Sequence, residues 1–300
     1  MKLIVICGAT ATGKSDLAVS VAKEINAEVI NADSMQLYKG MDIGTAKLSL
    51  SERKGIEHHL IDILEIKDDA NVAWYQSIAR SKIDELISAG KSVVVVGGTG
   101  LYIKAILDDL NFPDTNPELR QKITVEAENL GNEIMHQKLS KLDPAAALAI
   151  PKENLRRIIR ALEVIELTGK PFTANLPRAA SSKYPNALQF GLALDRDHLD
   201  QKIDKRVEAM WEKGFAREVS LLMTLGLEQS TTAKKALGYS QLMDYLNGEC
   251  SEEFAKEETK RSTKAYARRQ QTWFARDSRI NWIDAASTSA HLEKLLASIN

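Results

Sequence analysis

The chain has 300 residues, and its 40 Lys and Arg side chains nearly balance its 41 Asp and Glu side chains. This length favours two structural units, or one core that carries a large insertion. The near-neutral charge argues against a protein that coats nucleic acid indiscriminately, and the sequence has no apolar run long enough to span a membrane. Its two cysteines, Cys7 and Cys250, support neither a disulfide framework nor a zinc site.

Expected strands and helices alternate over the first third of the chain. Residues 2–7, 28–31 and 92–96 are short apolar runs rich in β-branched residues, whereas residues 15–25 and 73–89 carry apolar residues at helical spacing. This alternation predicts an α/β layer with a parallel sheet, whose ligands gather at the carboxyl ends of the strands. Because the first run is short and ends at glycines, we interpret it as a buried strand, not a signal peptide, and expect a cytoplasmic location.

The pattern becomes helical after the first third of the chain. Residues 117–170 hold long amphipathic stretches without a convincing strand, and residues 187–194 then restore a strand-like run. The sequence therefore predicts an α/β core formed by residues 1–112 and 186–300. An all-helical insertion is expected between them, at residues 113–185.

A phosphate-binding loop follows the first expected strand. Residues 8–15 read GATATGKS and fit the pattern G-x-x-x-x-G-K-[ST] between a strand and a helix. In such a loop, backbone amides surround a phosphate, the lysine neutralises charge, and the serine hydroxyl can hold a magnesium ion. Ser15 is therefore the candidate Mg²⁺ ligand. The candidate diphosphate-binding residues are Gly8, Ala9, Thr10, Ala11, Thr12, Gly13, Lys14 and Ser15.

The loop alone does not identify the diphosphate that it holds. A kinase or ATPase usually adds an acidic residue at the end of a neighbouring strand to organise magnesium. The run at residues 92–96 continues instead into Gly97-Gly98-Thr99-Gly100, and Asp62 is the best remaining acidic candidate. This pattern weakens the case for a nucleotide-hydrolysing function but does not exclude that function.

Further motifs carry a family resemblance. Residues 31–47 read NADSMQLYKGMDIGTAK, and here the chain resembles the tRNA dimethylallyltransferases, also called tRNA isopentenyltransferases. The resemblance covers nearly the whole chain, through motifs that occur in the family's order. They are HHLID at 58–62, GGTGLY at 97–102, RALE at 160–163, LTGK at 167–170, GY at 238–239 and RQQTWF at 269–274.

The resemblance implies a P-loop NTPase-like core and a specific reaction. A dimethylallyl group would move from dimethylallyl diphosphate to the exocyclic amine of adenosine 37 in the anticodon loop of a tRNA. Asp33 resembles the family's carboxylate, which would take the proton of that amine, and Thr99 resembles a substrate-contacting threonine. Taken alone, Asp33 could instead cap a turn, and Thr99 could belong to a tight strand-to-helix turn. The family further implies a compact, monomeric bacterial enzyme without an obligate protein partner.

An enzyme of this kind must extrude its target base and hold the surrounding RNA. Residues 260–279 contain seven basic side chains and one acid, which predicts a basic surface, although a solvated helix face is an equal alternative. Tyr266, Trp273 and Phe274 in this segment are expected to pack in the core more than to stack on bases. The candidate tRNA-binding residues are Asp33, Ser34, Met35, Gln36, Thr99, Arg120, Arg156, Arg157, Arg160, Lys235, Gly238, Tyr239, Arg268 and Arg269.

The chain departs from the family at one position of interest. Ser240 stands where the family usually continues Gly-Tyr with a basic residue, so a phosphate or RNA contact is in doubt there, although Lys234 and Lys235 lie close by. Three rival functions also stay open: a P-loop kinase or ATPase, a prenyltransferase of free adenine nucleotides, and a non-catalytic RNA-binding module. The helical insertion and the basic segment favour RNA over a free nucleotide. A non-catalytic module would not need Lys14, Ser15 or Asp33.

Overall fold

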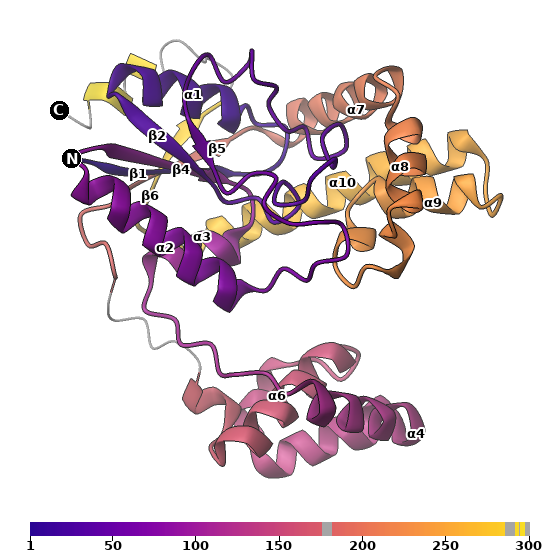
Figure 1. Ribbon diagram of the computed structural model, residues 1–300. Helices are drawn as coiled ribbons and strands as arrows, with labels where there is room; N and C mark the ends of the chain where they lie inside the picture. Colours follow the sequence, from indigo (N-terminus) through magenta and orange to yellow (C-terminus); the bar gives the residue numbers. More distant parts are fainter. Residues whose placement is uncertain (176–181, 286–291, 294, 298–300) are drawn as a thin grey trace. The chain divides into compact units, whose positions relative to one another are not determined.

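The computed structural model describes residues 1–175, 182–285, 292–293 and 295–297. The chain divides into two compact units, shown in Figure 1. We call residues 1–107 and 183–300 the core unit, and Asp108–Ser182 the insertion unit. The insertion unit thus starts before residue 113 and ends before residue 185, the boundaries expected from the sequence.

The core unit contains a six-stranded parallel sheet with the order β3-β2-β4-β1-β5-β6. This confirms the predicted α/β class. Strand β6 and the two-residue β3 were not predicted; only the first and fourth residues of β6 are buried, so its sequence does not read as an apolar run. The strands are β1 Leu3–Gly8, β2 Ala27–Asn31, β3 His58–His59, β4 Ser92–Gly97, β5 Leu188–Ala193 and β6 Ile280–Asp284.

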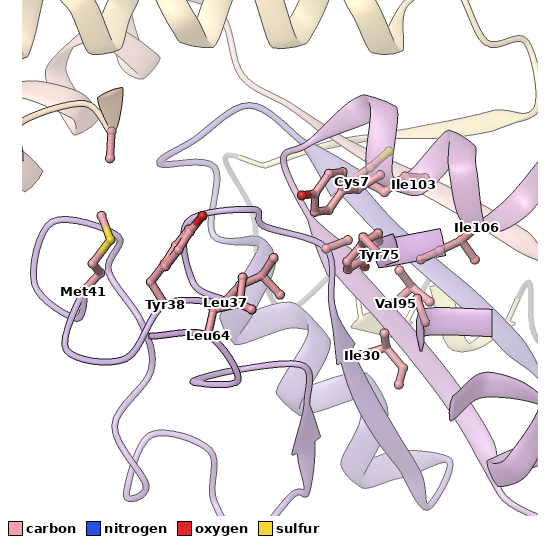
Figure 2. Packing of buried hydrophobic residues seen from close by; sticks show 14 of the residues in the cluster. Cys7, Ile30, Leu37, Tyr38, Met41, Leu64, Tyr75, Val95, Ile103 and Ile106 are labelled. Atoms are coloured by element: carbon pink, nitrogen blue, oxygen red, sulfur yellow. The ribbon is translucent and has the colours of Figure 1, made fainter. Parts of the chain in front are cut away.

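Helices cover both faces of this sheet. The core-unit helices are α1 Lys14–Glu24, α2 Val72–Ser88, α3 Gly100–Leu107, α7 Arg196–Glu212, α8 Phe215–Thr224, α9 Tyr239–Leu246 and α10 Glu252–Phe274, with short 3₁₀ turns at Leu227–Gln229 and Ala233–Lys235. Successive residues of β1 point to opposite faces, as in any strand. Ile4 and Ile6 pack with α1 and α7, whereas Val5 and Cys7 pack with α2 and α3. Figure 2 shows part of this second cluster, where Cys7, Ile30 and Val95 lie among side chains of α2 and α3.

The insertion unit is helical in its described residues, as the sequence predicts. It contains α4 Pro117–Leu142, α5 Pro144–Ala149, α6 Leu155–Thr168 and a 3₁₀ turn at Phe172–Asn175. The side chains of Asn116, Asp143 and Asn154 cap the three α-helices by accepting backbone N–H groups of the first turn. Helix α4 kinks at Gly131, whose φ of 78° only glycine adopts readily.

Helix length and hydropathy bear on membrane association. In the ranges that the structure describes, every helix is too short or too polar to cross a bilayer.

Candidate active site

The phosphate-binding loop connects β1 to α1. Gly8 has a φ of 139°, and a Cβ atom there would lie 2.7 Å from the carbonyl oxygen of Leu192. Only glycine therefore fits at the position where the chain leaves the sheet. Gly13 caps α1 with a φ of 88° and offers no capping side chain, which leaves the first amides of α1 available to an anion. The hydroxyl of Thr12 donates to the carbonyl of Ala9 at 2.9 Å and holds the loop closed.

Lys14 lies at the centre of this loop, and its ammonium donates to the carbonyl of Ala9 at 2.5 Å. Burial and, to a smaller extent, nearby Arg206 lower the pKa of Lys14 to about 8, while Asp33 opposes both effects. Arg206 comes from α7 and donates to the carbonyl of Thr45 at 3.4 Å. Burial lowers the pKa of this guanidinium too, against the attraction of Asp33. Two desolvated cations and one carboxylate thus share one site.

Affinity for a diphosphate should depend on the protonation of Lys14. Since the pKa of Lys14 is lowered to about 8 in the free protein and a bound anion favours the charged form, binding takes up a proton above that pH. We expect the affinity for inorganic diphosphate to fall by up to about tenfold per pH unit above pH 8. The Lys14→Arg variant stays charged throughout. When both proteins are titrated by calorimetry, the ionisation of the ligand affects the two affinities equally and cancels in their ratio. A ratio of the two affinities that stays constant from pH 7 to pH 10 would contradict this assignment.

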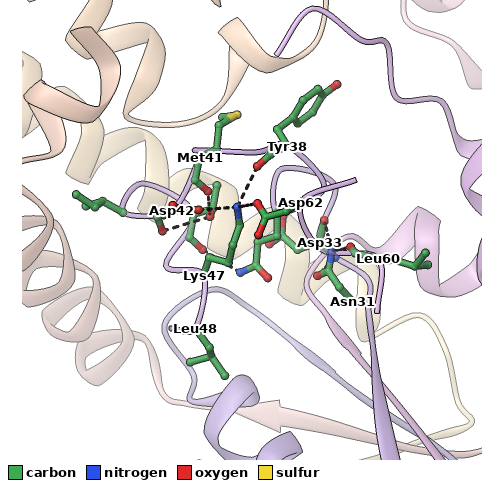
Figure 3. Close-up of polar contacts among 12 residues, drawn as sticks. Asn31, Asp33, Tyr38, Met41, Asp42, Lys47, Leu48, Leu60 and Asp62 are labelled. Atoms are coloured by element: carbon green, nitrogen blue, oxygen red, sulfur yellow. Dashed lines mark hydrogen bonds and ion pairs between the residues drawn. The ribbon is translucent and has the colours of Figure 1, made fainter. Parts of the chain in front are cut away.

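Asp33 follows β2 at the same edge of the sheet. Its Oδ1 accepts the amide of Met35 at 2.9 Å. Asn31 holds the backbone of Asp33 by accepting the Asp33 amide at 2.9 Å and donating to the Asp33 carbonyl at 3.0 Å (Figure 3). The turn-capping interpretation therefore applies to one carboxylate oxygen. Within the described residues, Oδ2 accepts no hydrogen bond, and the half-buried side chain lines the cleft of Lys14. The hydrogen bond to Oδ1 fixes the position of the carboxylate, whereas Oδ2 is available to accept a proton.

Thr99 joins the ends of β4 and β2. A Cβ atom on Gly97 would lie 2.2 Å from the carbonyl oxygen of Ala32, so the two strand ends approach as closely as a glycine allows. Directly after them, the Thr99 hydroxyl accepts the amide of Ser34 at 3.2 Å, and the Thr99 amide donates to Ala32 at 3.3 Å. The structure thereby places Thr99 beside the residue that follows Asp33.

The cleft at this edge collects residues from distant parts of the core unit. Asp33 is the one carboxylate side chain among the described residues that line it. The lining comprises Thr10, Lys14, Ser15, Asn31, Asp33, Gln36, Thr45, Ala46, Val96, Gly97, Gly98, Arg206, Tyr266 and Gln270. Sequence reasoning missed Arg206 and gave Gln270 no role. The one available signal for Arg206 was its position between Ile203 and Val207, which mark the buried stripe of α7.

Asp62, the acidic candidate for a nucleotide hydrolase, serves another purpose. Its carboxylate pairs with Lys47, whose side chain is only 3% exposed. The Lys47 ammonium also donates to Asp42 at 2.6 Å and to the carbonyl of Tyr38 at 2.9 Å, as Figure 3 shows. These contacts tie together the long segment after β2. Asp62 does not line the cleft, so the structure gives no support to the alternative of a nucleotide hydrolase in which Asp62 would organise magnesium.

Most of the positive charge in residues 260–279 is balanced in space. Helix α7 presents Glu208, Asp204 and Asp200 at four-residue spacing. They pair with Lys260, Lys264 and Arg268 of α10, respectively. Arg261 and Arg279 pair with acids close in sequence, Glu258 and Asp277. The predicted open basic surface is therefore largely neutralised. Within the described residues, Arg269 and Arg276 form no ion pair, and Arg269 lies 5.7 Å from the ring centroid of Tyr266.

The aromatic residues of α10 differ in burial. Phe274 is buried, which agrees with the expected core role. Trp273 is 44% exposed and packs against Gly100, where a Cβ atom would lie 2.2 Å from the indole. Tyr266 lines the cleft. The core expectation is thus correct for Phe274 alone.

The four candidate arginines of the insertion unit fall into two pairs. Arg120 and Arg160 donate to the fully buried carboxylate of Glu163, at 2.7 and 2.9 Å. These contacts lower the pKa of Glu163 against the effect of its burial. Arg156 and Arg157 are exposed and form no ion pair in the described part of the chain. Arg156 and Arg157 are therefore the arginines of α6 whose charge is not balanced by an ion pair in the described residues.

The turn at Gly238 leads into Tyr239, which is linked to the segment after β2 through Glu218. The side chain of Tyr239 is fully buried, and its hydroxyl donates to Glu218 at 2.6 Å. Glu218 in turn accepts the backbone amides of Asp42 and Ile43 at 3.1 and 2.7 Å. Tyr239 therefore orders the segment after β2, and its side chain is not on the surface where RNA contact was expected. Lys235 is exposed.

Comparison with known proteins gives one consistent result. The IPP transferase family profile matches residues 36–277. The tRNA dimethylallyltransferase of Streptomyces griseus is 50% identical over 282 residues, which cover 94% of this chain and 90% of that protein. Two solved structures are also similar in fold. The full-length tRNA isopentenylpyrophosphate transferase from Bacillus halodurans has a TM-score of 0.74 at 38% identity, covering 99% of this chain and 95% of that one.

The second similar structure is a eukaryotic dimethylallyltransferase acting on tRNA. Its TM-score is 0.83 at 26% identity, and the match covers 99% of this chain and 78% of that one. These matches confirm the resemblance seen in the motifs. By family profile, sequence identity and fold alike, the chain belongs to the tRNA dimethylallyltransferase family.

Proposed function

We propose that this chain transfers the dimethylallyl group of dimethylallyl diphosphate to the exocyclic N6 amine of adenosine 37 in a tRNA and releases diphosphate. The observation that carries the proposal is the cleft at the carboxyl edge of the sheet, where Asp33 faces Lys14, Ser15 and Arg206. A carboxylate with one unengaged oxygen lies there beside two cations. That combination suits removal of a proton and stabilisation of a departing diphosphate.

The reaction forms a bond between the adenine N6 and carbon 1 of the donor and breaks the bond between that carbon and the diphosphate oxygen. The diphosphate leaves with the bonding electron pair, and Asp33 Oδ2 takes the proton from the amine. Lys14, Arg206 and the backbone amides of residues 11–15 stabilise the charge that develops on the leaving group.

A magnesium ion fits this site only as a partner of the diphosphate. In the described residues, no cluster of three or more His, Cys, Asp or Glu side chains could hold a metal. Magnesium, however, is often held by one or two protein ligands together with substrate phosphates and water. Ser15, at the start of α1 and in the lining of the cleft, is the ligand we assign. When bound, the ion would neutralise part of the charge of the diphosphate.

Each unit, taken by itself, carries candidate RNA contacts. Ser34, Met35, Gln36 and Thr99 surround Asp33, where an extruded base would enter. Of the candidate tRNA-binding cations, Arg156, Arg157, Lys235 and Arg269 are the ones that are exposed and form no ion pair within the described ranges, which leaves them available to phosphates. Arg120, Arg160 and Arg268 would contact RNA from their ion pairs. We place this reaction in the cytoplasm and expect a monomer without an obligate protein partner.

A product assay tests the proposal. The protein is incubated with dimethylallyl diphosphate, magnesium and an anticodon stem-loop. The RNA is then digested, and the masses of its nucleosides are measured by mass spectrometry. We expect one isopentenyl unit on the target adenosine, and none on a stem-loop that carries guanosine there. Phosphate release from ATP without RNA modification would favour a kinase or ATPase. Faster modification of free adenine nucleotides than of the stem-loop would favour the nucleotide prenyltransferase.

A further inference from the structure

Helix α10 places a buried amide between two loops of the site. The side chain of Gln270 is almost fully buried, at 6% exposure. Its Oε1 accepts the amide of Thr10 in the phosphate-binding loop at 2.9 Å. Its Nε2 donates to the carbonyl of Gly98, in the turn after β4, at 2.8 Å. A Cβ atom on Gly98 would lie 2.3 Å from that nitrogen, so this approach also depends on glycine.

Gln270 bridges Thr10 and Gly98, which lie just beyond the last paired residues of β1 and β4. The pairing of β1 with β4 stops at Cys7 and Gly97, so the ladder no longer sets the separation of the loops that follow. One of these loops holds Lys14, and the other leads to Thr99, whose hydroxyl accepts the amide of Ser34 beside Asp33. Gln270 therefore lies in the chain of contacts that links the diphosphate cradle to the carboxylate.

We propose that Gln270 is a positioning residue, which holds the phosphate-binding loop and the turn at Gly98 at the separation that group transfer requires. The proposal rests on the proposed function. Since displacement of reacting groups by about 1 Å can cost about 10²-fold in rate, loss of this bridge should act on the transfer step. The loop amides of residues 11–15 and Lys14 would still bind the diphosphate.

The test uses a variant that keeps the volume of the side chain and removes its hydrogen bonds. We expect Gln270→Met to lower kcat by about 10- to 100-fold, while the KM for dimethylallyl diphosphate and the affinity for inorganic diphosphate change less than about threefold. The matched control is Gln271→Met. That neighbouring amide donates to Leu194 at a long 3.4 Å and does not line the cleft.

Two outcomes of the kinetic measurement would overturn the positioning role. The first is a kcat equal to that of the control once the folded fraction is measured by thermal melting. The second is a rise in KM with kcat unchanged, which would make Gln270 a substrate-binding residue.

Hydrogen exchange tests the bridge without any activity. In the ligand-free protein, amide exchange in the peptide covering residues 8–13 should be faster in Gln270→Met than in Gln271→Met. Unchanged exchange would overturn the bridge itself. An inactive wild-type protein would instead refute the proposed function, and the exchange measurement would still decide whether Gln270 holds the loop.

Discussion

Replacing Asp33 with Asn is expected to lower kcat for dimethylallyl transfer by about 10²- to 10⁴-fold, the usual contribution of a general base. Asn keeps the shape of the side chain and can still accept the amide of Met35, so the turn after β2 should persist. It cannot take a proton from the amine. Loss of the Asp33 carboxylate removes a negative charge that opposes diphosphate binding, but because Asp33 raises the pKa of Lys14, the decline of diphosphate affinity with pH should begin at a lower pH in the variant. Steady-state kinetics and calorimetry with inorganic diphosphate measure the two quantities separately.

The control for this variant is Asp16→Asn. Asp16 is an exposed carboxylate in the first turn of α1, close to the phosphate-binding loop in sequence, and it does not line the cleft. Its replacement should leave kcat unchanged. If Asp33→Asn retains kcat within about threefold of the control, Asp33 is not the base, and the proton must leave the amine by another route.

The phosphate-binding loop was predictable because its structure is local. Eight consecutive residues contain the two glycines that the backbone requires, and the flanking strand and helix follow from short apolar patterns. The location of Asp33 and Thr99 at one edge of the sheet was predictable for a related reason. Parallel strands end at one edge of a sheet, so the residues after β2 and β4 were expected at that edge, and the adjacency of β2 and β4 in the folded sheet makes them neighbours.

Arg206 and Gln270 were not predictable because tertiary packing brings them to the site. Each belongs to a helix rich in charged and polar residues, and neither sits in a motif whose chemistry could be deduced from spacing. The local sequence shows at most which stripe of the helix is buried. It does not show that this stripe ends at the loops after β1 and β4.

The charge of α10 was also misjudged from the sequence, because its ion pairs depend on tertiary packing. Counting residues along the chain finds one acid among the basic residues of 260–279, yet charges interact across space and not along the sequence. The compensating acids lie on α7, more than fifty residues earlier, and meet α10 only after folding. Tyr239 shows a similar limit: the motif that suggested it for RNA contact gives no sign that its hydroxyl donates to Glu218 in the interior.

Replacing Arg206 with Met is expected to lower kcat/KM for dimethylallyl diphosphate by about 10²- to 10³-fold, the usual effect of removing one group that stabilises transition-state charge. Methionine retains much of the buried volume and removes the cation. Since Arg206 lowers the pKa of Lys14, the variant should also raise that pKa. The decline in diphosphate affinity with pH should then begin at a higher pH than in the wild-type protein, which gives a second signature of lost charge.

Two further variants separate charge from geometry at this position. Lys205→Met removes the adjacent, exposed cation of α7 and should leave kcat/KM unchanged. Arg206→Lys keeps the charge but loses the planar guanidinium fork, so it should recover only part of the loss. If Arg206→Met matched Lys205→Met, Arg206 would be a structural cation that supports Thr45, and Lys14 with the loop amides would carry the leaving-group charge without it. If both Arg206 variants lost activity equally, bidentate contact with the diphosphate would matter more than charge alone.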